Sequence, residues 1–268
     1  MQIPIKTQKE IQAMREGGKI LGQCLRETAK RALPGVSTLE LDQFAEKFLR
    51  EHDAIPSFKG YQGFPATLCT NIDEQVVHGI PSKNQILKEG DIISIDCGCL
   101  YKDLHTDATV FIGVGDKNGN TKNLSPEKKR LITSANEILD IALNFIHDGI
   151  YLNNLCETIG KAIKSHSYGV VTELTGHGIG HRLHEPPHIP NQKEGTSSGP
   201  LLKTGMTLAI EPIFTTGSGK IITLSDNWTI VTADKSLAAQ IEHTILVTDS
   251  GCEILTNPGQ IPKARPKA

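Results

Sequence analysis

Two aspartates in otherwise apolar company, Asp96 and Asp107, are the residues best placed to do chemistry. Each lies in a run rich in β-branched residues, 92–97 and 106–112, and the polar segment between the runs predicts a β-hairpin. A loop centred just after Tyr101 would place the two carboxylates directly opposite each other, with Cβ atoms about 4.5–5.5 Å apart. Like charges this close in a buried sheet require a positive charge between them, and a divalent cation would supply it. The alternative is two unrelated aspartates at solvent-exposed strand ends.

A second pair of carboxylates follows from an internal repeat. The segment 90–96 matches 205–211, because each has a carboxylate six residues after a glycine, Asp96 in the first and Glu211 in the second. Asp107 and Glu242 match in the same way, since each is followed by x-Thr and an apolar run. The repeat predicts one domain of two fused α/β halves related by a pseudo-two-fold axis. Four carboxylates on facing strands would hold a large negative charge, which two divalent cations would neutralise.

His177 is the histidine most suited to join this site. Its neighbours Gly176, Gly178 and Gly180 are small, so its side chain is able to reach a crowded centre. Carboxylates with one imidazole suit manganese, iron(II), cobalt or zinc better than calcium, which takes oxygen ligands only. Two such metals would hold a hydroxide between them and polarise a carbonyl, which is the chemistry of amide or ester hydrolysis. The C-x-C pair Cys97 and Cys99 points to the strand face opposite Asp96, so we interpret it as packing rather than as zinc ligands.

The elements that must position these residues follow from caps and periodicity. Thr7 and Ser37 open helices with a capping box, the first ending near 33–35. Ser125 before a proline opens a third helix that runs to about residue 148, and a fourth is predicted from about 153 to 166. A loop is predicted over 186–200. Strands are expected around 66–70, 75–77, 170–173, 206–211, 221–223, 228–232 and 240–248.

Composition bounds the class of protein. The chain has 268 residues, of which 38% are hydrophobic and 22% charged, as is ordinary for a globular protein. A net charge of −2 favours neither nucleic acid nor an anionic membrane as the main partner. The sequence has no apolar run of about 20 residues, no signal-peptide core and no disulfide pattern among its six cysteines, which predicts a cytoplasmic protein with reduced thiols. Nothing marks an oligomer interface, so a monomer is expected.

Seven motifs in order give the chain a resemblance to a known family. It resembles the type I methionine aminopeptidases of the pita-bread (creatinase/aminopeptidase) fold, from about residue 11 to 255. The resemblance implies an α/β (α+β) fold with two pseudo-two-fold-related halves and a central antiparallel sheet flanked by helices. Residues 1–10 would be a short arm, and 256–268 a frayed tail. The motifs are Val77-His78-Gly79-Ile80-Pro81, Ile95-Asp96, Thr106-Asp107, Gly176-His177-Gly178-Ile179-Gly180, His184-Glu185-Pro186-Pro187, Ile210-Glu211-Pro212 and Gln240-Ile241-Glu242-His243-Thr244.

The resemblance also implies roles for the metal ligands. Asp107 and Glu242 would bridge two divalent metal ions, His177 and Glu211 would complete one ion, and Asp96 would chelate the other. Glu211 would also shuttle a proton between the bridging water and the leaving amine.

Two further histidines and four pocket residues receive roles on the same basis. His78 would hydrogen-bond the substrate peptide near the scissile bond, and His184 would stabilise the developing oxyanion. Taken without the resemblance, His78 is more often a solvated turn residue than a functional one, and a structural role is also favoured for His184. Trp228 is equally plausible as a core aromatic residue and as a pocket residue. The family lines its methionine pocket with residues that match Tyr61, Phe64, Cys69 and Trp228. Leu183 stands where an aromatic residue is frequent and Phe64 where tyrosine is common, and both changes keep the pocket apolar.

The implied function is removal of the initiator methionine from nascent polypeptides whose second residue is small. One alternative is an X-Pro peptidase of the same fold, although such enzymes usually carry a large extra N-terminal domain. Type II methionine aminopeptidases carry a helical insertion between the second catalytic histidine and the next glutamate, for which the 27 positions from His184 to Glu211 leave no room. A non-catalytic pita-bread binding module is the rival from another class, and such modules are expected to have lost metal ligands. The loop 217–220 has one lysine, so ribosome contact is at most a weak expectation.

Overall fold

The computed structural model describes residues 3–259, and its helices begin where the sequence predicts. α1 (Gln8–Ala29) and α2 (Thr38–Glu51) are both preceded by a complete capping box, at Thr7 and at Ser37. α3 (Pro126–Phe145) follows the cap Ser125, and α4 is Leu152–Ser165. α1 and α3 end a few residues before their expected ends. No helix among residues 3–259 is long and apolar enough to cross a membrane.

An antiparallel sheet of nine strands runs through the molecule, with two three-stranded sheets beside it. The main order is β1-β4-β5-β14-β9-β7-β8, with β2 paired to β4 and β15 to β14. The small sheets have the orders β13-β10-β6 and β11-β12-β3. The strands are β1 Ile55–Pro56, β2 Leu68–Ile72, β3 Gln75–Val77, β4 Ile92–Tyr101, β5 Leu104–Gly113, β6 Gly169–Val170, β7 Thr175–Gly178, β8 Glu185–Pro190, β9 Thr207–Ile210, β10 Ile213–Thr215, β11 Ile221–Thr223, β12 Ile230–Thr232, β13 Ala238–Gln240, β14 Glu242–Val247 and β15 Cys252–Ile254.

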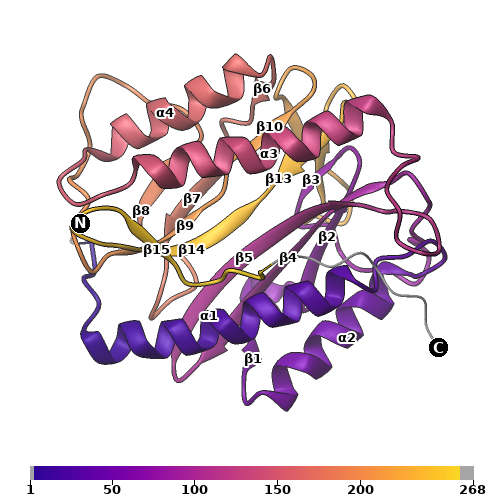
Figure 1. Ribbon diagram of the computed structural model, residues 1–268, viewed down its shortest axis with the longest axis horizontal. Helices are drawn as coiled ribbons and strands as arrows, with labels where there is room; N and C mark the ends of the chain where they lie inside the picture. The colour runs from indigo at the N-terminus through magenta and orange to yellow at the C-terminus, as the bar shows by residue number, and fades with distance from the viewer. Residues whose placement is uncertain (1–2, 260–268) are drawn as a thin grey trace.

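The centre of the sheet is symmetric, as the internal repeat predicts. β4 and β5 form one antiparallel pair, β9 and β14 form the other, and β5 and β14 meet in the middle. α1 and α2 lie along the half that contains β4 and β5, and α3 and α4 lie along the other half (Figure 1). The prediction of two fused halves with a central antiparallel sheet flanked by helices is therefore confirmed.

The two faces of β4 have different surroundings. Cys97 and Cys99 are fully buried in the core shared with α1 and α2, where Leu21 and Leu25 are also buried. Asp96 points to the other face, which lines a cavity. The interpretation of the C-x-C pair as packing residues is confirmed, because strand alternation separates these thiols from the carboxylate.

The register of the β4–β5 hairpin differs from the predicted one by two residues. Asp96 lies opposite Thr109, and Asp107 lies opposite Gly98. The turn consists of Lys102 and Asp103, whose φ angles of 49° and 63° are the positive values that a two-residue hairpin turn requires. No glycine marks this turn, so the sequence placed its centre one residue too early. The carboxylates remain on one face, but as diagonal neighbours about 7–8 Å apart in the backbone, which leaves room for an ion between them.

A segment that the sequence predicts as a loop forms a strand, and the first residue of the predicted frayed tail is buried. Residues 186–190 were expected in a loop, and they instead complete β8, which lies at the end of the sheet order. Its prolines are tolerated because an edge strand does not use every N–H group. Thr256, at the start of the expected frayed tail, is fully buried, and its Oγ1 accepts a hydrogen bond from the N–H of Thr244. The tail residues 260–268 lie outside the described residues.

Candidate active site

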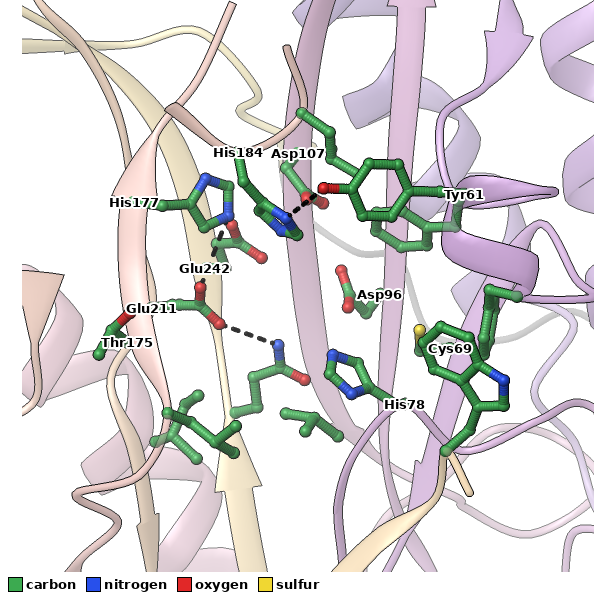
Figure 2. Close-up of a pocket in the computed structure, with 18 of the residues that line it drawn as sticks. Tyr61, Cys69, His78, Asp96, Asp107, Thr175, His177, His184, Glu211 and Glu242 are labelled. Carbon is green, nitrogen blue, oxygen red and sulfur yellow. Dashed lines mark hydrogen bonds and ion pairs between the residues drawn. The ribbon is translucent and has the colours of Figure 1, made fainter. Parts of the chain in front are cut away.

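A cavity of about 350 Å³ opens on the face of the central sheet that is turned away from the helices. All five predicted metal ligands line it, and Figure 2 shows the four carboxylates and His177 converging on one region. His78, His184 and the predicted pocket residues Tyr61, Phe64, Cys69 and Trp228 line the same cavity. The structure therefore brings together every residue that the sequence analysis assigned to the site.

Three strands place a row of polar side chains across the cavity floor. Asp96 on β4 lies opposite Thr109 on β5, and Thr109 in turn lies opposite Glu242 on β14. The hydroxyl of Thr109 donates a hydrogen bond of 3.1 Å to Oε2 of Glu242. Asp107 lies two residues from Thr109 on the same face, and its backbone N–H donates to Oγ1 of Thr244 at 2.8 Å. The carboxylates are thus held by strands whose pairing fixes their separation.

His177 and Glu211 close the other side of the row. Nδ1 of His177 lies 2.9 Å from the carbonyl oxygen of Gly178, so this nitrogen must carry the proton. Nε2 then presents its lone pair to the cavity, and it lies 3.8 Å from Oε1 of Glu211. The side-chain amide of Gln240 donates to Oε2 of Glu211 at 3.3 Å. Both groups are therefore oriented by a neighbour before any ligand arrives.

Burial sets the protonation of these groups. It raises the pKa of Asp96 to about 7, and it raises the pKa values of Asp107, Glu211 and Glu242 well above the ordinary range. The neighbouring carboxylates add to each of the last three shifts. Burial also lowers the pKa of His177 to about 3, so this ring is neutral and able to act as a ligand. Four carboxyl groups this close cannot all ionise unless positive charge compensates them.

The donor set fits divalent cations. Ligand atoms of Asp107, His177 and Glu242 lie within 4.8 Å of one another. Within residues 3–259, one buried oxygen on each of Asp96, Asp107 and Glu242 has no hydrogen-bond partner. Buried acceptors are rarely left without partners, so these oxygens are available to ligate an ion. Mixed carboxylate and imidazole donors suit the transition metals predicted from the sequence.

Metal binding is expected to release protons and to stabilise the protein more at higher pH. In metal-free protein the raised carboxyl pKa values make the folded chain hold protons that the unfolded chain releases above about pH 4. This contribution to stability is complete below about pH 4, and it is lost as the pH rises through the raised pKa values, which for Asp96 means through about 7. Thermal unfolding with and without Mn²⁺ should therefore show a larger metal-induced rise in Tm at pH 7.5 than at pH 5. Equal metal-induced rises in Tm at the two pH values would contradict the expectation. Calorimetry of metal binding in two buffers of different ionisation enthalpy measures the number of protons released.

Two further histidines flank the ligands, His184 beside His177 and His78 on the side of Asp96 (Figure 2). Nδ1 of His184 lies 3.0 Å from the hydroxyl of Tyr61, and its ring meets that of His177 edge to face. His78 has a φ of 58°, a strained conformation for this residue, and the next peptide is held by a hydrogen bond from the Gly79 N–H to Oδ1 of Asn71. Burial lowers the pKa of His78 to about 4, so the ring is neutral at pH 7. His78 is half-buried, and a neutral ring held in an uncommon backbone conformation is typical of a functional position.

The far end of the cavity is apolar. Phe64 is buried and packs edge to face on Trp228, with 5.1 Å between ring centroids. Cys69 is buried beside them, and burial raises the pKa of its thiol well above the ordinary value, which keeps it neutral. Leu183, which the sequence analysis noted only as a departure from the family, is also buried in this cluster. This end accepts an apolar side chain and offers it a sulfur and aromatic edges.

Two polar contributors were not singled out from the sequence, Thr109 and Gln240. Each lies two residues from a ligand, Asp107 in one case and Glu242 in the other. Alternation along a strand puts residues two apart on one face, and this signal was present in the sequence. The sequence carried no signal for the pairing of β5 with β14, which brings Thr109 next to Glu242.

Comparison with known proteins places this site in a family. Residues 12–249 match the metallopeptidase family M24. The methionine aminopeptidase of Clostridium acetobutylicum is 44% identical over 254 residues, which cover 95% of this chain and 98% of that protein. The crystal structure of the methionine aminopeptidase from Thermotoga maritima superposes with a TM-score of 0.90 at 38% identity and covers 95% of this chain and 99% of that one.

A more distant neighbour shares the fold alone. The prolidase from Pyrococcus furiosus has a TM-score of 0.74 at 23% identity, and the match covers 96% of this chain but 66% of the prolidase. The methionine aminopeptidases, by contrast, match from end to end. The chain therefore belongs to the metallopeptidase family M24 and, within it, to the methionine aminopeptidases.

Proposed function

We propose that the chain is a metal-dependent aminopeptidase that removes the initiator methionine from new polypeptides whose second residue is small. One observation carries the proposal: four buried carboxylates and a neutral histidine line one end of a cavity whose other end is apolar and aromatic. The first end supports hydrolysis, and the second supports binding of a thioether side chain. Membership of the methionine aminopeptidases supports the same substrate.

The ligands divide between two cations. Asp107 and Glu242 are proposed to bridge both ions, His177 and Glu211 to complete one, and Asp96 to chelate the other. The proximity of ligand atoms on Asp107, Glu242 and His177 supports the first part of this assignment. Cobalt, manganese, iron(II) or zinc bound here would supply an activated water and a Lewis acid for the scissile carbonyl.

The remaining chemistry falls to three side chains. Glu211 takes a proton from the attacking water and gives it to the leaving amine, and its position in the cavity, where the amide of Gln240 orients its carboxylate, supports this role. His184 donates from Nε2 to the carbonyl oxygen as negative charge develops there. His78, on the opposite side, hydrogen-bonds the substrate peptide next to the scissile bond.

Methionine binds at the apolar end of the cavity. Tyr61, Phe64, Cys69 and Trp228 surround its side chain and offer dispersion and sulfur–aromatic contacts. With the methionine side chain in the apolar end, the scissile bond lies beside the carboxylates at the other end of the cavity. A large second residue would crowd the polar end, which explains the restriction to small residues.

Peptide hydrolysis by metal-stripped protein tests the proposal. Met-Ala-Ser and an X-Pro peptide are each incubated with stripped protein, with and without added Co²⁺ or Mn²⁺. Metal-dependent release of methionine from Met-Ala-Ser alone is the expected result. Cleavage of the X-Pro peptide instead would move the protein to the prolidases, which share its fold. No cleavage with any metal would favour a binding module despite the complete ligand set.

Several properties accompany this function. We propose that residues 11–255 act as one catalytic domain, because both halves of the chain contribute carboxylates to one cavity. We place the enzyme in the cytoplasm, where nascent N-termini appear, and its six unpaired cysteines suit a reducing compartment. We also propose that it is a monomer. Contact with the ribosome through the loop 217–220 is a weaker proposal, because that loop carries one lysine.

A further inference from the structure

The strongest feature outside the assigned site is a buried ion pair directly beside His184. Nζ of Lys6, in the N-terminal arm, lies 2.7 Å from Oε2 of Glu185, and the two side chains are 1% and 2% exposed. Glu185 is the residue that follows His184 in the chain. The sequence analysis gave neither Lys6 nor Glu185 a role.

Glu185 ties down the loop that carries His184. Its second oxygen, Oε1, accepts a hydrogen bond of 2.9 Å from the backbone N–H of Arg182, which closes the turn around His184. The start of the same loop is held from β5, where the N–H of His105 donates to the carbonyl oxygen of Gly180 at 2.7 Å. The Lys6 stem fills the space beside Gly180, where an added Cβ would collide with Cε of Lys6.

The arm is itself anchored at Lys6 and at the next residue, Thr7. The backbone N–H of Lys6 donates to the carbonyl oxygen of Gly205 at 2.8 Å, and the N–H of Gly205 donates to Val247 on β14 at 3.0 Å. Thr7, the next residue, caps α1. The backbone of Lys6 is therefore held in place by the central sheet and by the start of α1.

Stability alone is a poor explanation for this pair. Removing two charges from water is costly, and apolar residues of similar size often stabilise a buried position at least as well. What an ion pair adds is a defined position and direction, because Glu185 must meet Lys6 and the Arg182 N–H simultaneously. The side chain of His184 is held independently from the other side of the cavity, by the hydroxyl of Tyr61.

We propose that Lys6 is a positioning residue, which acts through Glu185 to hold His184 where its ring is able to reach the scissile carbonyl. The catalytic consequence rests on the proposed function, whereas the structural consequence does not. The N-terminal arm is then part of the active-site scaffold rather than a passive leader to α1.

A pair of variants tests the proposal. Lys6→Met removes the ammonium group and leaves Glu185 buried without a partner, so it is expected to lower Tm as well as activity. Lys6→Met combined with Glu185→Gln removes both charges at nearly constant shape, and it is expected to fold with a smaller loss of Tm. In the double variant kcat for Met-Ala-Ser is expected to fall about 10- to 100-fold, because a misplacement of about 1 Å has effects of this size. KM is expected to change less, because the apolar end of the cavity is untouched.

The matched control is Arg15→Met. Arg15 pairs with Glu253 at 2.7 Å and also ties the N-terminal region to the sheet, but neither residue lines the cavity. This variant is expected to keep wild-type kcat even where its Tm falls. A double variant with wild-type kcat would show that the Lys6–Glu185 pair is structural only and would overturn the proposal.

A second measurement does not depend on peptidase activity. Imidazole NMR spectra of metal-free, ¹⁵N-histidine-labelled protein report the tautomer and environment of His184, whose signals are identified by their loss in His184→Gln. The double variant is expected to shift or broaden these signals, and Arg15→Met is expected to leave them unchanged. An unchanged His184 signal in the double variant overturns the proposal, whatever the peptidase activity of that variant. Wild-type protein that cleaves no methionine peptide would refute the proposed function, while a displaced His184 signal would still support positioning.

Discussion

Asp107→Asn is expected to abolish methionine release without unfolding the protein. Asparagine keeps the shape of the side chain but is a neutral, weaker ligand with a single oxygen donor, so it cannot bridge two cations. Because bound metal contributes several kcal/mol of transition-state stabilisation, its loss should lower kcat/KM at least about 10³-fold. Metal-free Asp107→Asn should be no less stable than wild type, since the change removes a group whose ionisation is opposed by burial and by Asp96 and Glu211.

The measurements are kcat/KM on Met-Ala-Ser with saturating Co²⁺ or Mn²⁺, metal affinity by calorimetry and Tm of the metal-free protein. Asp103→Asn is the matched control, because it makes the same chemical change in the same hairpin. Asp103 is exposed, and its φ of 63° lies in the left-handed region that asparagine also tolerates. Asp103→Asn should retain wild-type activity. Near-wild-type turnover by Asp107→Asn would contradict the bridging role of Asp107. Glu242→Gln tests the same role at the second bridging residue, and the same loss of activity is expected.

His184→Gln is expected to lower kcat by about 10²–10³-fold, which is the usual cost of losing one donor to a developing oxyanion. The donor has a defined direction. A phenol is a better hydrogen-bond donor than imidazole, so the Tyr61 hydroxyl is expected to donate to Nδ1 of His184 and leave the proton on Nε2. KM should change less than kcat, because the oxyanion forms only in the transition state.

His181→Gln is the control for this variant. His181 lies in the same loop, is 56% exposed and pairs with Glu10 at 2.9 Å, so its loss should leave kcat unchanged. Steady-state kinetics on Met-Ala-Ser separates kcat from KM. A His184→Gln enzyme whose KM rises while kcat stays constant would show that His184 contributes to substrate binding and not to stabilisation of the transition state.

Local interactions explain which parts of the fold were predictable. Thr7, Ser37 and Ser125 begin helices in the structure as they do in the sequence, because each cap bonds a backbone N–H group three residues away. The hairpin register was missed because the turn at Lys102 and Asp103 adopts positive φ without a glycine. β8 was missed because three prolines within six residues are typical of a loop, and only its place at the sheet edge makes them acceptable.

The sequence alone determined the chemistry of the site. The carboxylates recur at matching places in two halves of the chain, and side-chain type and strand alternation are properties of short segments. The positions and orientations of these groups, by contrast, depend on the tertiary structure. Thr109 reaches Glu242, Tyr61 reaches His184 and Lys6 reaches Glu185 across separations of 133, 123 and 179 residues. Such contacts depend on which strands pair and where the arm lies, and no local pattern encodes them.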